Sequence, residues 1–265
     1  MFKLQNVSLS YEKLEVLDNF SIKGEINQSI CLFGPSGVGK SSILNIIAGI
    51  LKPNYGSITS NNEQLAYVFQ EPRLLPWMTV EQNMEVGLYN FKKSSRWRKN
   101  VVRQLLPRIG LEKFGKYYPE QLSGGMKQRV SIGRAFVTQP DLLLLDEPFS
   151  GLDESLKTEM QDLILSLKNW HKCTTVMVTH DMQEAIKLSD RIIVLDDRPC
   201  RLIIDVAVNA KDKKNPEYKS KLEERIIWAK QNNKKGERQN DEKESFISNN
   251  FPGSNHKCSG VRWGY

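Results

Sequence analysis

The chain has 265 residues, of which 39% are hydrophobic and 26% are charged, and its formal net charge is +7. A chain of this length and composition can bury a sizeable core, which predicts one or two globular domains and excludes disorder throughout. The positive excess is spread thinly along the sequence, so net charge alone identifies neither a nucleic-acid nor a membrane partner.

The longest apolar run, "ILNIIAGIL" at residues 43–51, is too short for a membrane span, which needs about eighteen or more residues. The N-terminus alternates apolar and polar residues as a strand does and lacks the apolar block of a signal peptide. Four scattered cysteines without a CxxC pair favour free thiols in a reducing compartment. We therefore expect a cytoplasmic protein.

Five short apolar runs end in polar residues, and they predict strands buried on both faces of a largely parallel sheet. They are "SICLF" before Gly34, "LAYVF" before Gln70, "DLLLLD" ending at Asp146, "TTVMVTH" ending at His180 and "RIIVLD" ending at Asp196. The segments between them have helical patterns, so the fold class is α/β. Ligands of such sheets bind beyond the carboxyl ends of the strands, and we expect the first four polar endings to converge on one crevice.

Helical patterns dominate residues 81–121, which predicts a smaller helical subdomain inserted in the sheet domain. Within it, "KKSSRWRK" at 92–99 favours a solvated helix face over a nucleic-acid or lipid contact. Residues 216–230 could form one more amphipathic helix. From Gln231 onward the chain is polar, and we expect residues 231–265 to be disordered.

A phosphate-binding loop is the most specific single motif. "GPSGVGKS" at 34–41 matches GxxxxGK[ST], directly after a strand and before a helical run. Backbone N–H groups of the loop and the helix dipole favour phosphate, while Lys40 should neutralise the β- and γ-phosphates and Ser41 should bind Mg²⁺. An ordinary glycine turn is the alternative. The expected nucleotide contacts are Gly34, Pro35, Ser36, Gly37, Val38, Gly39, Lys40, Ser41 and Ser42.

Two acidic residues and a histidine at strand ends could complete a nucleoside triphosphatase. In "LLLLDEP" at 142–148, Asp146 can hold magnesium through water, and Glu147 can act as general base on the attacking water. Acids that merely cap the next segment are the alternative. His180 could reach the γ-phosphate or the water, although a lone histidine is more often structural.

A second glycine-rich turn, "LSGGMKQRV" at 122–130, follows about eighty residues after the first. The order of phosphate loop, glutamine after a strand, LSGGMKQR, LLLLDEP, SGLD and strand-end histidine resembles the ATP-binding-cassette (ABC) ATPases over about residues 2–230. The resemblance implies a P-loop NTPase fold with a mainly parallel core sheet, an N-terminal antiparallel β part and a helical subdomain at about 81–135. The ATPase domain would then span residues 1–230.

The resemblance also assigns roles to residues outside the phosphate loop. It implies that Tyr11 stacks on adenine and that Gln70 meets both Mg²⁺ and the membrane partner, while His180 is the switch histidine. Residues 150–153 match a loop that communicates across the dimer. The signature residues are Ser123, Gly124 and Gly125. In this family two cassettes pack head to tail, so the signature of one closes over the ATP of the other.

The stretch "VFQEPRLLPWMTVEQN" at 68–83 is similar to importer cassettes for nitrate, taurine, aliphatic sulfonates and thiamine-pyrimidine precursors, and "DDRPCR" at 196–201 is similar to their C-terminal stretches. This resemblance implies a homodimer, a separate membrane permease, a solute-binding protein outside the membrane, ATP and Mg²⁺ as cofactors, no nucleic acid, and a peripheral position on the cytoplasmic side. An exporter cassette, a nucleic-acid-associated ABC ATPase and a non-catalytic regulatory subunit are the alternatives.

Overall fold

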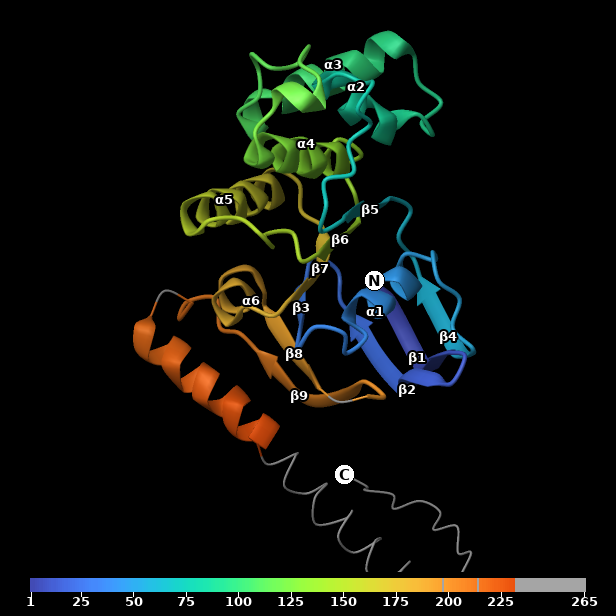
Figure 1. Cartoon of the computed structure of the whole chain (residues 1–265), viewed down its shortest axis with the longest axis vertical. Helices are drawn as coiled ribbons and strands as arrows, with labels where there is room; N and C mark the ends of the chain where they lie inside the picture. The colour runs from blue at the N-terminus through green and yellow to red at the C-terminus, as the bar shows by residue number, and fades with distance from the viewer. Residues whose placement is uncertain (197, 214, 232–265) are drawn as a thin grey trace, which may run out of the picture.

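The computed structural model describes residues 1–196, 198–213 and 215–231. Two sheets and a helical part make up these residues (Figure 1). The larger sheet has six strands in the order β5-β6-β7-β3-β8-β9. Neighbouring strands from β5 to β8 are parallel, and β9 joins the edge antiparallel to β8. The sequence-based expectation of a mainly parallel α/β sheet is therefore confirmed.

All five runs expected as strands belong to this larger sheet. Its strands are β3 (Ser29–Phe33), β5 (Leu65–Val68), β6 (Leu142–Asp146), β7 (Thr174–Thr179), β8 (Arg191–Asp196) and β9 (Arg201–Ala207). Helices cover both faces, so the central strands have no solvated side, and every residue of β3 and β7 is buried. Continuous burial explains why these strands are continuous apolar runs.

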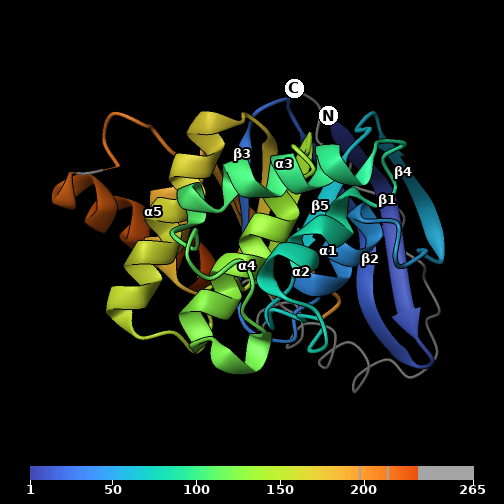
Figure 2. The same ribbon diagram turned by 90° about the horizontal axis from the view of Figure 1, so that it is seen from above.

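The N-terminal chain forms a separate antiparallel sheet in the order β2-β1-β4. Its strands are β1 (Phe2–Tyr11), β2 (Leu14–Gly24) and β4 (Tyr55–Ser60). The apolar side chains of this sheet share one core cluster with helix α1 (Lys40–Ile47) and with one face of the larger sheet, including Ile30 and Leu32 of β3. Seen from above, the three strands lie to one side of the molecule (Figure 2). The expected antiparallel β part is confirmed.

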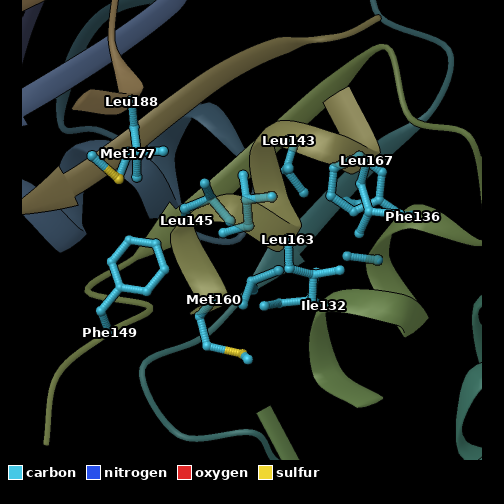
Figure 3. Packing of buried hydrophobic residues seen from close by; sticks show 14 of the residues in the cluster. Ile132, Phe136, Leu143, Leu145, Phe149, Met160, Leu163, Leu167, Met177 and Leu188 are labelled. Carbon is cyan, nitrogen blue, oxygen red and sulfur yellow. The ribbon is translucent and has the colours of Figure 1, made fainter. Parts of the chain in front are cut away.

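The opposite face of the larger sheet carries the second core cluster. Leu143, Leu145 and Met177 point from the strands toward Met160 and Leu163 of helix α5 (Glu154–Trp170), as Figure 3 shows. Residues that alternate along one strand thus enter opposite clusters, because successive side chains of a strand point to opposite faces. The helices α4 (Gly124–Phe136) and α6 (Met182–Leu188) also pack on this face.

Residues 81–121 are less helical than their spacing predicts. The structure has α2 (Val80–Glu85), α3 (Ser95–Leu105) and 3₁₀ turns η1 (Val86–Leu88), η2 (Pro107–Ile109) and η3 (Pro119–Gln121), with irregular chain between them. Proline cannot continue a helix, which explains why α3 ends before Pro107. Gly110 then takes a left-handed φ of 69°. In Figure 1 these short helices lie with α4, apart from the strands.

The expected amphipathic helix near the C-terminus is present over residues 216–231, where Leu222 and Ile226 are buried against the sheet domain. Disorder was expected for residues 231–265. Residue 231 still belongs to this helix, and residues 232–265 lie outside the described residues. Within the described part of the chain, no helix combines the length and apolar character needed to cross a membrane.

Candidate nucleotide site

The phosphate loop joins β3 to α1, and its shape depends on glycine. Gly37 and Gly39 have φ values of 79° and 111°, which side chains rarely allow. A Cβ atom at Gly34 would lie 2.4 Å from the carbonyl oxygen of Leu195, so the loop also needs a small residue there. Glycine at these positions lets the backbone turn closely around a ligand.

Lys40 is buried inside this loop, where only 4% of its surface is exposed. Its Nζ donates hydrogen bonds to the carbonyl oxygens of Gly34, at 2.8 Å, and Pro35, at 2.7 Å. Burial lowers the pKa of the ammonium group, and the nearby carboxylates of Glu147 and Asp146 oppose that shift. The loop therefore holds a positive charge at its centre, where the β- and γ-phosphates are expected.

Asp146 receives two hydroxyl donors from different elements. Ser41 Oγ donates to its Oδ1 at 2.9 Å, and Tyr67 of β5 donates to its Oδ2 at 3.1 Å. Burial raises the pKa of Asp146, and both hydrogen bonds lower it. Hydroxyl and carboxylate oxygens are ligands that Mg²⁺ prefers, so Ser41 and Asp146 fit a shared magnesium ion.

Glu147 and His180 meet across the neighbouring strands β6 and β7. His180 Nδ1 lies 3.3 Å from Glu147 Oε2, and the side chain of Glu147 is 17% exposed while that of His180 is 58% exposed. Glu147 also has a left-handed φ of 43°, a strain of about 1–3 kcal/mol that is typical of functional sites. Its main-chain N–H donates to the Val178 carbonyl at 3.1 Å, which holds this turn against β7.

A cavity of about 420 Å³ gathers most of the expected nucleotide contacts. Its lining consists of Tyr11, Leu14, Val16, Ser36, Gly37, Gly39, Lys40, Ser41, Ser42, Gln70, Glu147 and Arg198. Val38 is buried in the core, so its side chain packs inward and only its main chain can face a nucleotide. Gln70 Nε2 donates to Ser150 Oγ at 3.2 Å, which links the cavity to the loop at 150–153.

Sequence reasoning missed two polar residues of this site, Tyr67 and Arg198. Tyr67 lies in the middle of an apolar strand, where an aromatic residue is expected for packing alone. Arg198 belongs to "DDRPCR", which carries a resemblance but no recognisable chemistry of its own. Arg198 and Gly37 of the phosphate loop are 161 residues apart, so no local sequence pattern could have predicted their contact.

The signature turn has a different position. Ser123 is the N-cap of α4, and its Oγ accepts a hydrogen bond from the Met126 N–H at 3.3 Å. A Cβ atom at Gly124 would meet nothing within 4 Å, whereas one at Gly125 would lie 2.6 Å from Leu156. Among the described residues, none of Ser123, Gly124 and Gly125 lines the 420 Å³ cavity. The structure therefore brings the other motifs together around one site, whereas the signature lies outside that cavity, at the start of α4.

The phosphate loop at the carboxyl edge of a parallel sheet, with an acidic pair on a neighbouring strand, defines a P-loop nucleoside triphosphatase. A family model described as "ABC transporter" matches residues 17–150. The chain belongs to the ABC transporter family, and it is an ATPase of that family.

Two groups of relatives have sequences similar to most of the chain. The aliphatic sulfonates import ATP-binding protein SsuB 2 of Pseudomonas syringae pv. tomato is 41% identical over 204 residues, covering 76% of this chain and 86% of the relative. The bicarbonate transport ATP-binding protein CmpD of Synechococcus elongatus is 37% identical over 216 residues, covering 77% and 78%.

Solved structures of cassettes have the same fold. A dimeric bacterial ABC transporter cassette, MJ0796, superposes with a TM-score of 0.71 at 30% identity, covering 79% of this chain and 100% of that chain. The dimer of MJ0796 in a post-hydrolysis state, bound to ADP and Pi, gives a TM-score of 0.70 at 29% identity with the same coverage.

Proposed function

We propose that this ABC ATPase is the ATP-hydrolysing subunit of an importer and works as a head-to-tail homodimer on the cytoplasmic side of a separate permease. The aliphatic sulfonates import relative named above supports the direction of transport. The observation that carries the dimer is the signature at Ser123–Gly125, an open helix start that lies outside the cavity holding Lys40. A phosphate-binding turn with no place in its own chain's site suits the site of a second chain.

Different residues of the cavity bind different parts of ATP. Tyr11, 48% exposed at the cavity rim, offers its ring to adenine, and the amides of the phosphate loop bind the phosphates. Lys40 exchanges its carbonyl partners for the β- and γ-phosphates. Ser41 and Asp146, with Gln70 beside them, would hold Mg²⁺, which would supply positive charge to the phosphate oxygens.

Glu147 and His180 carry the hydrolytic step. A water attacks the γ-phosphorus, the bond to the leaving ADP oxygen breaks, and Glu147 accepts the proton of the water. His180, within 3.3 Å of the Glu147 carboxylate, holds that group in position and can reach the γ-phosphate. The two side chains sit at the ends of adjacent parallel strands, so their spacing is set by the sheet register.

Opening and closing of the dimer then follow the nucleotide. Ser123 and the amides of α4 bind the γ-phosphate of the partner chain's ATP, which makes the nucleotide part of the interface. Hydrolysis removes the phosphate that joins the halves. The closed dimer is thus favoured only while ATP is bound, as a population shift requires.

The loop after Gln70 presents an aromatic side chain to the permease. Arg134 of α4 donates to the carbonyl oxygens of Arg73, at 2.9 Å, and Pro72, at 2.7 Å. The side-chain amide of Asn83 accepts from the main-chain N–H of Leu75 and donates to the carbonyl oxygen of Leu75. Trp77, between Leu75 and Asn83 in this loop, is 70% exposed, and an exposed aromatic on an anchored loop suits a membrane-protein partner.

The solute is proposed to be a small molecule of the nitrate, sulfonate, taurine or thiamine-pyrimidine type, delivered to the permease by a solute-binding protein. The test is to purify the chain with the permease encoded beside it, reconstitute the complex in lipid vesicles, and measure ATPase activity with the binding protein and each solute, with bicarbonate included because of the second relative. We expect one solute class to raise the rate several-fold, and a complex with Lys40→Ala to show no response. Failure of the chain to join any permease would contradict the importer assignment.

A further inference from the structure

Arg198 reaches the nucleotide cavity from a part of the chain that none of the nucleotide motifs includes. It lies in the turn between β8 and β9, and it lines the same cavity as Tyr11 and Lys40. Its Nε donates a hydrogen bond to the carbonyl oxygen of Gly37, in the middle of the phosphate loop, at 2.8 Å. The guanidinium is therefore in direct contact with the loop that binds phosphate.

The main chain fixes the position of this turn. The N–H of Cys200 donates to the carbonyl oxygen of Val16 at 2.8 Å, and Leu17 and Cys200 form a β-bridge. Cys200 is buried, with 1% of its surface exposed, and Val16 itself lines the cavity. The β8–β9 turn is thus attached to β2 beside the nucleotide site, so Arg198 is directed into the cavity by backbone contacts.

Gly37 is shaped to accept the guanidinium. A Cβ atom at Gly37 would lie 2.4 Å from Nη2 of Arg198, and the φ of 79° independently disfavours a side chain. The guanidinium therefore occupies the space that a side chain at position 37 would need. Any larger residue at position 37 would displace either the loop or Arg198.

The charges of the cavity suit an anionic ligand with more than one negative group. Lys40 is buried, where loop carbonyls hold it, and Arg198 is exposed; both line the cavity, together with Glu147. A guanidinium carries five N–H donors in a planar fork that matches phosphate oxygens, and the bond to Gly37 uses the donor on Nε. Two cations in the lining of one cavity suit the several negative charges of a phosphate chain.

We propose that Arg198 is a further nucleotide-binding residue, which holds the phosphate loop at Gly37 and donates from its terminal nitrogens to the phosphate chain of ATP. This inference rests on the ATPase function proposed above. Arg198 remains attached to Gly37 with or without nucleotide, so it both shapes the loop before binding and contributes charge after it.

Equilibrium binding of ATP without magnesium tests the proposal, because hydrolysis and the partner signature are then not involved. A fluorescent ATP analogue is titrated against the parent, Arg198→Gln, Arg198→Lys and, as a control, Arg103→Gln, which removes the same charge from an exposed position on α3. We expect the Kd of Arg198→Gln to rise about tenfold, as for a lost charge-assisted hydrogen bond, with Arg198→Lys in between and Arg103→Gln at the parental value. The dependence of Kd on salt should also become shallower in Arg198→Gln.

Each outcome separates this inference from the ATPase function. A parent chain that does not bind the analogue would contradict the nucleotide site as a whole. A parent that binds, together with an Arg198→Gln variant that binds equally well, would overturn the role of Arg198 alone. An equal loss in Arg103→Gln would do the same, since net charge would then explain the effect. Unchanged thermal unfolding of Arg198→Gln without nucleotide shows that the variant is folded.

Discussion

Tyr67 donates its hydroxyl to Oδ2 of Asp146 at 3.1 Å, from a strand next to the one that ends in Asp146. The ring of Tyr67 stacks on Phe69 with centroids 4.2 Å apart, and the guanidinium of Arg73 lies 4.0 Å above the Phe69 ring. A continuous row of contacts thus runs from the Asp146 carboxylate, the proposed magnesium ligand, to the loop that carries Trp77. Tyr67 donates to one oxygen of Asp146, while the other accepts from Ser41 and is the oxygen we propose for the metal.

Replacing this tyrosine tests the positioning of the carboxylate. Tyr67→Phe keeps the stacking and removes only the hydroxyl, so we expect the magnesium concentration for half-maximal ATPase activity to rise about tenfold, as when a partner of a metal ligand is lost. Tyr55→Phe, on an exposed tyrosine of β4, is the matched control and should leave the magnesium curve unchanged. If Tyr67→Phe had the parental magnesium concentration for half-maximal activity, the Tyr67 hydroxyl would not be needed to position Asp146.

Glu147→Gln should separate binding from hydrolysis. The amide keeps the size of the side chain but cannot accept the proton of the attacking water, so we expect phosphate release to fall by about a hundredfold or more. ATP affinity should stay close to the parental value, because Lys40 and the loop amides are intact. Phosphate release and ATP binding on the same preparation measure both effects, and hydrolysis at the parental rate would remove Glu147 from the role of general base.

The residues that the sequence could predict are those whose role is set by local chemistry. Gly34, Asp146 and His180 end buried parallel strands, and the carboxyl ends of such strands share one edge of the sheet, so their convergence follows from the apolar pattern alone. The signature could be recognised from its letters, and its separation from the cavity agrees with a role in a second chain's site. Neither inference required knowledge of packing.

Arg198, Tyr67 and the helix lengths in residues 81–121 could not be predicted because they depend on tertiary contacts. The Arg198 contact exists only because the β8–β9 turn is bonded to Val16 on the other sheet. Helical spacing along 101–109 is real, but Pro107 and Gly110 interrupt it, and packing decides which turns persist. Periodicity reports the buried face of a segment and says little about where each helix ends.

A mixture of two inactive variants tests the shared site. Lys40→Ala removes the ammonium group that should bind phosphate. Ser123→Arg places a bulky cation where the signature should meet phosphate. Each homodimer should therefore be nearly inactive. In a head-to-tail heterodimer one site carries both defects and the other carries none, which should restore ATPase activity to roughly half the parental value per heterodimer if its single intact site turns over independently.

The activity recovered in this experiment depends on how many heterodimers form by subunit exchange. The two variants are mixed at increasing ratios, and activity should peak near equal amounts, because heterodimers are then most abundant. Ser123→Arg alone should still bind ATP, since its own loop is intact. Retained activity in Ser123→Arg alone, or no recovery in mixtures shown to exchange subunits, would indicate that each chain completes its own site.

Trp77→Ala should uncouple the ATPase from its permease without damaging the catalytic site. The side chain is 70% exposed and lies outside the nucleotide cavity, so the isolated chain should hydrolyse ATP at the parental rate. In vesicles containing the permease, we expect solute-stimulated activity and the amount of co-purified complex to fall about tenfold or more, since exposed aromatics at such interfaces are frequent hot spots.

Trp228→Ala is the matched control, because Trp228 is 67% exposed on the helix at 216–231. Equal losses in both variants would point to a general effect of removing surface tryptophan, whereas parental coupling in Trp77→Ala would place the permease contact elsewhere on the cassette.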